Sequence, residues 1–455
     1  MKRFVDNIIA TLLRRWPLIG RGDTTRRPRQ KGIAIVLDAL TVIVGFEVAV
    51  VAMQIISGAR ALPLGIILGG LLLSLLFLGC TKLLMSVGYS SFAKEINVAD
   101  LLERDVIPLQ PSEAHAVLKG QIILVTGAAG SIGSELCRQL LNYEPELVIA
   151  LDNNETGLFD LAESVRSHSH AVHFYPHIAD ITNQQTISRL FAEKRPHIIF
   201  HAAAYKHVPL LEGFPDQAIR TNVLATYQLC RLAQEHEVAR FVFISSDKAG
   251  TPSGVMGASK RIGEMIIQCL AKSADFETRF CAVRFGNVIG SRGSVVPIFA
   301  RQIEQGGPIT VTDPEATRYF MTIPEACALV ILTAAIADQG GLYLLDMGNP
   351  VRIKDLAIKM IHLRGLRVGR DIPVVYTGLR PGEHLHEILL AANEELVSTV
   401  HSKIFCIAHK DKLPVLTTIA QWMDTLDHAL QHESNTQLRE RLFEMVREQE
   451  LIVSS

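Results

Sequence analysis

The chain has 455 residues, and its 45 Lys and Arg against 46 Asp and Glu give a net charge of −1 and a sequence pI near 7.0. This balance excludes a general nucleic-acid binder, which needs a marked basic excess. The length allows two or three domains. Seven cysteines, scattered without a Cys-x-x-Cys motif, indicate reduced residues in a cytosolic compartment rather than a disulfide framework.

Two apolar segments near the N-terminus predict a transmembrane helical hairpin within residues 32–87. Residues 33–56 are apolar apart from three polar side chains, and residues 61–81 carry no charge. Each segment is long enough to cross a hydrocarbon core of about 30 Å. A pair of buried core helices is the alternative, which the length and uniformity of the second segment disfavour.

Residues 1–31 form a basic arm, with nine Lys or Arg against two Asp. The positive-inside rule places this arm in the cytoplasm, and two crossings return the remaining chain to the same side. We therefore expect a multi-pass protein of the inner (cytoplasmic) membrane that contacts membrane lipid through the hairpin. Residues 88–119, which contain Pro108 and Pro111 among mixed charges, predict a juxtamembrane connector.

From residue 120 onward, strand-like segments alternate with helical patterns. The expected strands are 121–126, 147–151, 171–175, 197–201, 241–245 and 280–285. Such alternation predicts a parallel sheet with helices on both faces. Residues 411–455 predict terminal helices.

A glycine-rich turn lies between the first strand and a helix expected over 131–141. Gly127, Gly130 and Gly133 allow a tight turn and let a pyrophosphate approach the helix N-terminus. Asp152 follows at the end of the second strand, where a carboxylate can bind the adenosine ribose and so favours NAD over NADP. The alternative is a glycine-rich turn without a ligand.

Further dinucleotide contacts are expected where the other strands end. Asp180 follows the third strand and is the expected neighbour of the adenine, and the small residues after His201 let a dinucleotide pass close to the backbone. The expected cofactor contacts in the glycine-rich turn and at the strand ends are Gly127, Gly130, Ser131, Ile132, Gly133, Asp152, Asp180, Ile181, Ala202, Ala203 and Ala204.

The segment Ser245-Ser246-Asp247-Lys248, followed by Met256 and Lys260, is the candidate for proton-transfer chemistry. Met256 and Lys260 are four residues apart, so they share one face of a helix. A thioether cannot transfer a proton, whereas a carboxylate and an amine can. Asp247 and Lys248 are therefore the candidate acid and base, and an ordinary ion pair in a loop is the alternative.

Residues 120–410 resemble the extended short-chain dehydrogenase/reductase superfamily, and within it the CapD-type polysaccharide biosynthesis proteins, the UDP-N-acetylglucosamine 4,6-dehydratases. The matching motifs are TGAAGSIGSE (126–135), HAAAYKHVPLLE (201–212), SSDKAGTP and MGASKR (245–261), RFGNVIGSRGSVVP (284–297), TRYFMTIPEA (317–326) and LRPGEHLHE (379–387). The resemblance implies a Rossmann-type doubly wound parallel sheet with a smaller C-terminal substrate-binding portion, here preceded by the transmembrane hairpin.

The resemblance also implies the reaction. A hydride passes from sugar C4 through NAD to C6, water is lost between C5 and C6, and a 4-keto-6-deoxy sugar results. Met in place of the Tyr that most short-chain dehydrogenases use occurs in this family. Members of the superfamily commonly form dimers through two long helices, so a homo-oligomer is expected.

Residue roles follow from the resemblance. Lys248 is the candidate base at C5, for which it needs a depressed pKa, and Asp247 is the candidate acid at the C6 oxygen. Lys260 is expected to hold the nicotinamide ribose, with Lys206 and Asn222 as further cofactor contacts. Ser246 is expected to bind the C4 hydroxyl, and Met256 to shape the pocket. The group that deprotonates the C4 hydroxyl stays open between Lys248, Asp247 and water.

The UDP half of the substrate is assigned to a second set of residues. Arg318 and Arg380 are expected at the diphosphate because guanidinium groups match phosphate oxygens. Glu383 is expected at the uridine ribose, and Asn287 and Val295 at the UDP. The role of Lys206, near the cofactor or the sugar, stays open.

The same residues are compatible with other functions. A UDP-sugar epimerase or a 5-inverting dehydratase fits the same scaffold, and a catalytically silent nucleotide-sugar sensor is the alternative of another class. The retention of Asp247, Lys248 and Lys260 argues against the sensor. No metal is expected, because the histidines clustered within 168–177 lack the cysteine or carboxylate spacing of a closed site.

Overall fold

The computed structural model describes residues 112–166, 173–272, 277–409 and 414–451. The predicted basic arm, the predicted hairpin and most of the predicted connector, residues 1–111, lie outside the described residues. No helix within the described ranges combines the length and apolar character that a membrane span requires. The chain divides into two compact units, and segments 300–309 and 361–373 belong to the smaller one.

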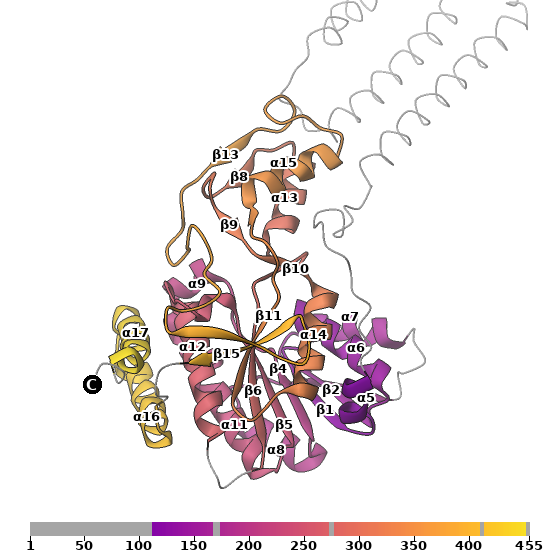
Figure 1. The fold of residues 1–455 in the computed structure, drawn as a ribbon, viewed down its shortest axis with the longest axis vertical. Coiled ribbons are helices and arrows are strands. Elements are labelled where there is room, and N and C mark those ends of the chain that lie inside the picture. The colour runs from indigo at the N-terminus through magenta and orange to yellow at the C-terminus, as the bar shows by residue number, and fades with distance from the viewer. Residues whose placement is uncertain (1–111, 167–172, 273–276, 410–413, 452–455) are drawn as a thin grey trace, which may run out of the picture. The chain divides into compact units, whose positions relative to one another are not determined.

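A nine-stranded sheet forms the centre of the larger unit (Figure 1). Its strand order is β14-β15-β11-β6-β5-β4-β1-β2-β3. All neighbours pair in parallel except β14 with β15 and β15 with β11, which pair antiparallel. The strands are β1 (Ile122–Thr126), β2 (Leu147–Asp152), β3 (Phe174–Ile178), β4 (Ile198–His201), β5 (Arg240–Ile244), β6 (Arg279–Arg284), β11 (Gly341–Leu345), β14 (Glu394–Ser398) and β15 (Ile404–His409).

The predicted parallel sheet is therefore confirmed. Within it, β3-β2-β1-β4-β5-β6 is the strand order of doubly wound dinucleotide-binding folds. Five predicted strands match β1, β2, β4, β5 and β6 to within one residue at either end. The third strand begins at Phe174, later than the predicted start at residue 171.

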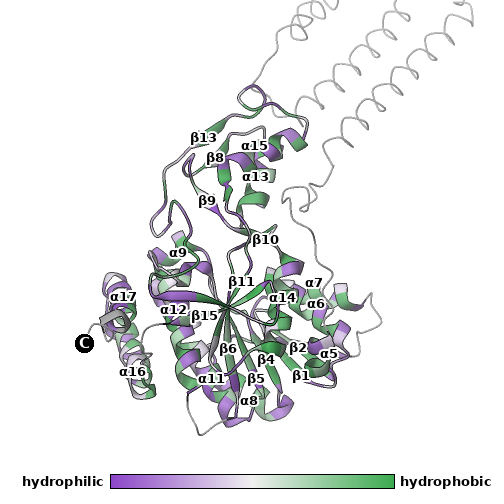
Figure 2. Ribbon diagram, viewed as in Figure 1, coloured by the Kyte–Doolittle hydropathy of each residue, from purple (hydrophilic) through white to green (hydrophobic). Residues whose placement is uncertain are grey.

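One face of the sheet is covered by helices that share a single apolar cluster. These helices are α5 (Ser112–Leu118), α6 (Ser131–Leu140), α7 (Glu155–Arg166) and α14 (Ile323–Ile336). Figure 2 shows α14 and the neighbouring strands in the hydrophobic colour. Helix α5 lies in the range predicted as a connector, yet Ala114 and Leu118 are fully buried, so this end of the range packs into the core.

The opposite face carries α8 (Gln184–Lys194), α11 (Ala225–Glu235) and α12 (Val255–Leu270). All residues of α12 are buried. The terminal helices α16 (Leu416–His432) and α17 (Asn435–Leu451) contact α12 and join the same apolar cluster. Figure 1 shows these two helices beside α12. The predicted terminal helices are thus present, and they complete the core on this side.

The remaining elements are short, and several of them carry residues that line the cavity described below. They are α9 (Val208–Gly213), α10 (Pro215–Gln217), a π-helical turn (Ala218–Leu224), a short 3-10 turn (Asp247–Ala249), β7 (Asn287–Ile289), α13 (Val295–Glu304), β8 (Ile309–Val311), β9 (Thr317–Arg318), β10 (Phe320–Thr322), β12 (Val351–Arg352), α15 (Ile353–Leu363) and β13 (Val374–Tyr376). Strands β7 and β10 pair in parallel, and β9 pairs with β12.

Candidate active site

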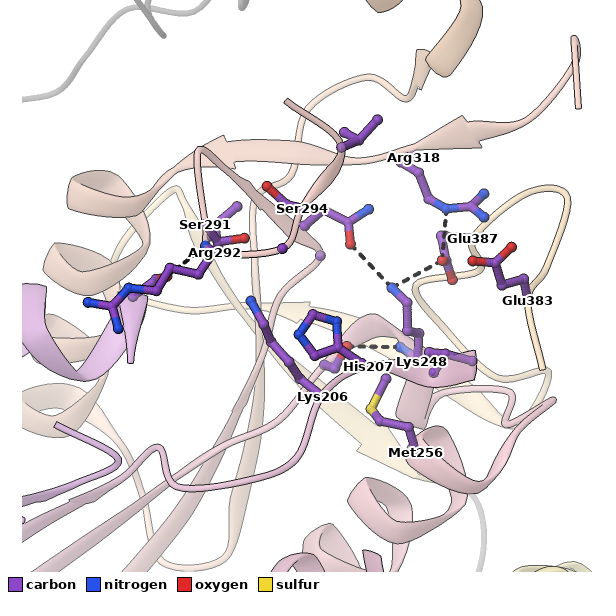
Figure 3. A pocket seen from close by; sticks show the side chains of 18 of the residues that line it. Lys206, His207, Lys248, Met256, Ser291, Arg292, Ser294, Arg318, Glu383 and Glu387 are labelled. Atoms are coloured by element: carbon purple, nitrogen blue, oxygen red, sulfur yellow. Dashed lines mark hydrogen bonds and ion pairs between the residues drawn. The ribbon is translucent and has the colours of Figure 1, made fainter. Parts of the chain in front are cut away.

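A cavity of about 790 Å³ opens where β1, β4 and β5 end, and loops from distant parts of the larger unit line it (Figure 3). Most residues singled out in the sequence line this one cavity. They are Gly127, Gly130, Ser131, Ile132, Gly133, Ala202, Ala204, Lys206, Ser246, Lys248, Met256, Lys260, Asn287, Val295, Arg318, Arg380 and Glu383. The structure therefore brings the expected cofactor, proton-transfer and nucleotide residues together.

Six expected residues do not line the cavity. They are Asp152, Asp180, Ile181, Ala203, Asn222 and Asp247. Asn222 is buried and binds both the N–H and the carbonyl of Tyr205 and the hydroxyl of Ser259, so it supports the wall. Among the residues described, no cluster of three or more His, Cys, Asp or Glu could hold a metal ion.

The glycine-rich turn is a close-packed cradle at the N-terminus of α6. Gly127 has a φ of +69°, and a Cβ there would lie 2.6 Å from the Ala203 nitrogen. A Cβ on Gly133 would lie 2.1 Å from the Gly127 oxygen. No side chain caps α6, so its first N–H groups remain available to an anion. The cradle fits a pyrophosphate.

Asp152 stands beside this cradle at the end of β2. One carboxylate oxygen accepts the Ala129 N–H at 2.9 Å, and the other accepts the Asn154 N–H at 2.9 Å. Each oxygen keeps a second lone pair. The side chain is thereby fixed in place and can still accept hydrogen bonds from ribose hydroxyls.

Helix α12 presents Met256 and Lys260 to the cavity, as their spacing predicts. Lys260 Nζ donates to the Ile244 carbonyl at 2.8 Å and lies 4.7 Å from the centre of the Phe243 ring. Burial lowers the pKa of Lys260 to about 8, against a smaller opposing effect of Glu264. Lys260 is thus a poorly solvated amine in the cavity wall.

Lys248 lies among three oxygens. Its Nζ is 2.9 Å from Asp247 Oδ1, 3.0 Å from Glu387 Oε1 and 3.4 Å from Asn287 Oδ1. Burial by itself lowers the pKa of Lys248, but the carboxylates of Asp247 and Glu387 outweigh burial and raise it. The depressed pKa expected for Lys248 is therefore wrong for this arrangement, because the second carboxylate was not foreseen.

Asp247 lies behind Lys248 rather than in the cavity wall. Its side chain is fully buried, Oδ1 accepts hydrogen bonds from Ser246 Oγ at 2.8 Å and from Lys248 Nζ, and it begins the 3-10 turn after β5. Its other oxygen, Oδ2, has no hydrogen-bond partner among the described residues. Asp247 can therefore act on the cavity through Lys248.

Glu387, which lines the cavity beside Lys248, is a residue to which the sequence assigned no role. Its Oε1 lies 3.0 Å from Lys248 Nζ and 3.1 Å from Arg318 Nε. The only sequence signal was its place at the end of the LRPGEHLHE motif. Because the motif lies far from Lys248 in the chain, no spacing argument connects the two residues.

The two arginines expected at a diphosphate differ in their surroundings. Arg318 donates to the carbonyls of Thr317 at 2.7 Å, Leu385 at 3.0 Å and His384 at 2.8 Å, besides its ion pair with Glu387. Arg380 is exposed, and among the described residues its guanidinium group pairs with Glu383 alone, through hydrogen bonds of 3.0 and 2.5 Å. Arg380 is the freer of the two to meet a ligand.

A buried ion cluster underlies the Ser245–Lys248 segment. Arg284 binds Glu264 and Glu394, at 2.7 Å in each case, and Arg261 joins both carboxylates. Ser245 Oγ donates to Glu264 at 2.6 Å. The cluster ties α12, β6 and β14 together beneath the catalytic candidates, and no periodicity in the sequence points to it.

Two relatives match about 70% of the chain. Capsular polysaccharide biosynthesis protein CapD of Staphylococcus aureus is 48% identical over 313 residues, which cover 69% of this chain and 52% of that protein. EpsC of Bacillus subtilis is 45% identical over 71% of this chain and 54% of its own length. This chain thus spans about half the length of these relatives.

A shorter relative has a more specific name. UDP-N-acetylglucosamine 4,6-dehydratase (inverting) of Campylobacter jejuni is 29% identical over 300 residues, which cover 65% of this chain and 85% of that protein.

Two solved structures show the same fold. Pen from Bacillus thuringiensis is 32% identical with a TM-score of 0.60, over 64% of this chain and 89% of that one. DesIV, a dTDP-glucose 4,6-dehydratase from Streptomyces venezuelae with NAD and TYD bound, is 22% identical with a TM-score of 0.52, over 59% and 88%. The model of the polysaccharide biosynthesis protein family matches residues 123–409. The chain therefore belongs to this family, as a CapD-type member of the extended short-chain dehydrogenase/reductase superfamily.

Proposed function

We propose that this protein is an NAD-dependent UDP-N-acetylglucosamine 4,6-dehydratase. It converts the UDP-N-acetylhexosamine into a UDP-4-keto-6-deoxy-N-acetylhexosamine and one water. The product feeds synthesis of a surface polysaccharide or another glycan. The reaction takes place at the cytoplasmic face of the inner membrane, where the predicted hairpin anchors the chain.

One observation carries this proposal. Lys248 Nζ lies between the carboxylates of Asp247 and Glu387, in the wall of the cavity that also contains the glycine-rich cradle. Elimination of water across C5 and C6 needs one proton removed at C5 and one delivered to the C6 oxygen. A paired amine and carboxylate beside a dinucleotide cradle supply both proton transfers.

The cradle supports NAD as the cofactor. Gly127, Gly133 and the uncapped N-terminus of α6 leave room and N–H groups for the pyrophosphate, and Asp152 offers oxygens for the adenosine ribose. NAD supplies the acceptor that takes two electrons from the sugar and returns them within one turnover, so no external reductant is consumed. Lys260 holds the nicotinamide ribose from α12.

Lys248 and Asp247 divide the proton transfers. Lys248 contacts the substrate. Asp247 lies behind it, with Oδ1 2.9 Å from Lys248 Nζ, and exchanges protons with the amine. Ser246 lines the cavity and orients the C4 hydroxyl, while Met256, which is 4% exposed, shapes the wall. Water can enter beside Lys248 to take the C4 hydroxyl proton.

The nucleotide end of the substrate is assigned to the rim formed by the LRPGEHLHE motif. Arg380 leaves Glu383 to bind the diphosphate, which frees the Glu383 carboxylate for the uridine ribose. Asn287 and Val295 contact the UDP from the opposite loop. Arg318 contributes positive potential from its fixed position.

The 5-inverting dehydratase is the second candidate, because the Campylobacter jejuni relative has that name. The same groups serve both reactions, and they differ only in the face on which C5 regains its proton. An epimerase, the activity named for several relatives from Rickettsia, requires no loss of water.

The test uses the full chain in detergent with UDP-N-acetylglucosamine deuterated at C4 and no added reductant. NMR of the product should show deuterium at C6, a ketone at C4 and the configuration at C5. Deuterium that stays at C4, in a product that has not lost water, would instead identify an epimerase. UDP binding without turnover on a panel of UDP-hexosamines would contradict the enzyme and favour a nucleotide-sugar sensor.

A further inference from the structure

Glu387 is a buried carboxylate that two cations share. Its side chain is 3% exposed, and one oxygen, Oε1, lies 3.0 Å from Lys248 Nζ and 3.1 Å from Arg318 Nε. Figure 3 shows both contacts at the cavity wall, with Glu387 between the two cationic side chains. No motif or spacing assigned a role to this residue.

The surroundings of Lys248 match the charged form of its amine. An ammonium has three N–H donors and no acceptor. Nζ has three oxygens in reach: Asp247 Oδ1 at 2.9 Å, Glu387 Oε1 at 3.0 Å and Asn287 Oδ1 at 3.4 Å. A neutral amine would turn its lone pair toward one of these oxygens. Without substrate, the site therefore holds Lys248 as the ammonium, which must lose a proton before it can act as a base.

Arg318 fixes the position of Glu387. Three backbone carbonyls, those of Thr317, His384 and Leu385, accept hydrogen bonds from its guanidinium group. An arginine held in this way cannot follow a moving partner. Its Nε thus anchors the carboxylate of Glu387 at a constant distance from Lys248.

Charge balance gives Glu387 a specific effect. The group contains two cations, Lys248 and Arg318, and two anions, Asp247 and Glu387, all within ion-pair distance of a neighbour. Loss of one carboxylate charge would leave an excess positive charge in a buried site. Only the lysine can relieve it, because an arginine does not lose its proton in proteins.

We propose that Glu387 is a positioning residue that keeps Lys248 protonated in the resting site and sets the pH at which Lys248 becomes a base. This inference rests on the proposed function in assigning Lys248 to proton transfer. Through Arg318, the same carboxylate ties the proton-transfer group to the nucleotide-binding rim of the cavity.

The test measures the titration of Lys248 directly, without turnover. Full-length protein in detergent is labelled with trace acetic anhydride over a range of pH values, and mass spectrometry quantifies acetylation of Lys248. Glu387→Gln keeps the shape and an acceptor oxygen but removes the charge. The midpoint for Lys248 should fall by about one pH unit or more, the usual effect of an opposite charge at this distance.

Glu383→Gln is the matched control, because Glu383 lines the same cavity but pairs with Arg380. Its Lys248 midpoint should equal that of the wild type. Arg318→Met tests the opposite direction. It removes the second cation that Glu387 binds, so the carboxylate pairs with Lys248 alone and the Lys248 midpoint should rise. This variant also provides a measurement should Glu387→Gln fail to fold.

Kinetics gives a second readout. In the pH profile of kcat/KM, the limb that reports the titration of Lys248 should shift to lower pH in Glu387→Gln. A residue with only a structural role would lower activity at every pH without moving the midpoint. An unchanged Lys248 midpoint in a folded Glu387→Gln protein would overturn the inference. Because labelling needs no substrate, a failure of the proposed dehydratase activity would be recognised separately.

Discussion

Two lysines in one cavity have opposite electrostatic surroundings. Lys248 lies between two carboxylates that raise its pKa, whereas Lys260 is buried against Phe243 and a backbone carbonyl, and burial lowers its pKa to about 8. Groups whose environments separate their pKa values in this way take different parts in acid–base chemistry. The amino-acid type is the same, and the neighbours decide the role.

Lys248→Ala should abolish exchange of the substrate C5 proton with deuterium from solvent while NAD remains bound. Removal of a positioned general base costs on the order of 10²–10⁴-fold in rate. NMR of UDP-N-acetylglucosamine in D₂O measures the exchange, and the absorbance of released cofactor measures NAD. Met256→Ala, which removes only packing, should cost far less. Exchange at the wild-type rate in Lys248→Ala would remove this residue from the role of base.

Lys260 makes the free energy of unfolding depend on pH. Its folded pKa of about 8 lies below its ordinary value of 10.5, so between these values the unfolded chain binds more protons and stability rises with pH. The contribution is fully present above 10.5 and is lost as the pH falls through about 8. Lys260→Met removes it, so the advantage of the wild type should grow with pH, by roughly 1.4 kcal/mol for each unit of pKa shift.

Urea denaturation of both full chains at several pH values within this window measures the difference. A constant difference between wild type and Lys260→Met would show that Lys260 has an ordinary pKa in the folded protein.

At the scale of elements, the buried ion cluster joins α12, β6 and β14. Arg284 is fully buried and binds Glu264 on α12 and Glu394 on β14. With Arg261 the cluster holds two positive and two negative charges. Its neutrality allows four ionised side chains to remain in the core. The cluster thereby sets the position of Ser245, directly before the proton-transfer residues.

Arg284→Met should destabilise the protein by about 3–5 kcal/mol, because it leaves an uncompensated buried carboxylate. Arg441→Met is the control, since Arg441 forms a solvent-exposed pair with Glu433, and such pairs are worth about 1 kcal/mol or less. Urea denaturation of the two variants measures both effects. Equal stability losses would show that the cluster adds nothing beyond a surface ion pair.

At the scale of the whole molecule, α16 and α17 complete the core over α12. No residue of α12 remains exposed. Trp422 of α16 and Leu442 of α17 belong to the same apolar cluster as α12. Helix α12 therefore offers no free surface to a second chain, and the homo-oligomer expected from the sequence stays a prediction.

Deletion of residues 414–455 should expose the apolar face of α12. The truncated chain is expected to bind a hydrophobic dye, to unfold at lower urea concentration and to self-associate, because large exposed apolar patches promote association. Light scattering and dye fluorescence against the full chain in the same detergent measure these effects. Leu442→Ala should give a milder loss of about 2–5 kcal/mol. A truncated chain as stable and monodisperse as the full one would contradict this role.

The local sequence predicted the elements and the cofactor cradle. Strand and helix alternation follows from side-chain periodicity, so β1, β2, β4, β5 and β6 were placed to within one residue. The glycine turn was recognised because its backbone sterics depend on only seven consecutive residues. The start of β3 was predicted too early in the chain, because the apolar pattern there does not mark a boundary. The core contacts of α5 were not predicted, because so short a helix leaves no periodic signal in the sequence.

By itself, the sequence determined the α/β order, the glycine turn before α6 and the identity of the side chains that can transfer protons. These features depend on neighbours within one or two turns of chain. The charge of Lys248 depends on the folded chain, because Glu387 and Asn287 reach it from distant segments. Electrostatic energy depends on distance in space, and the folded chain alone sets that distance.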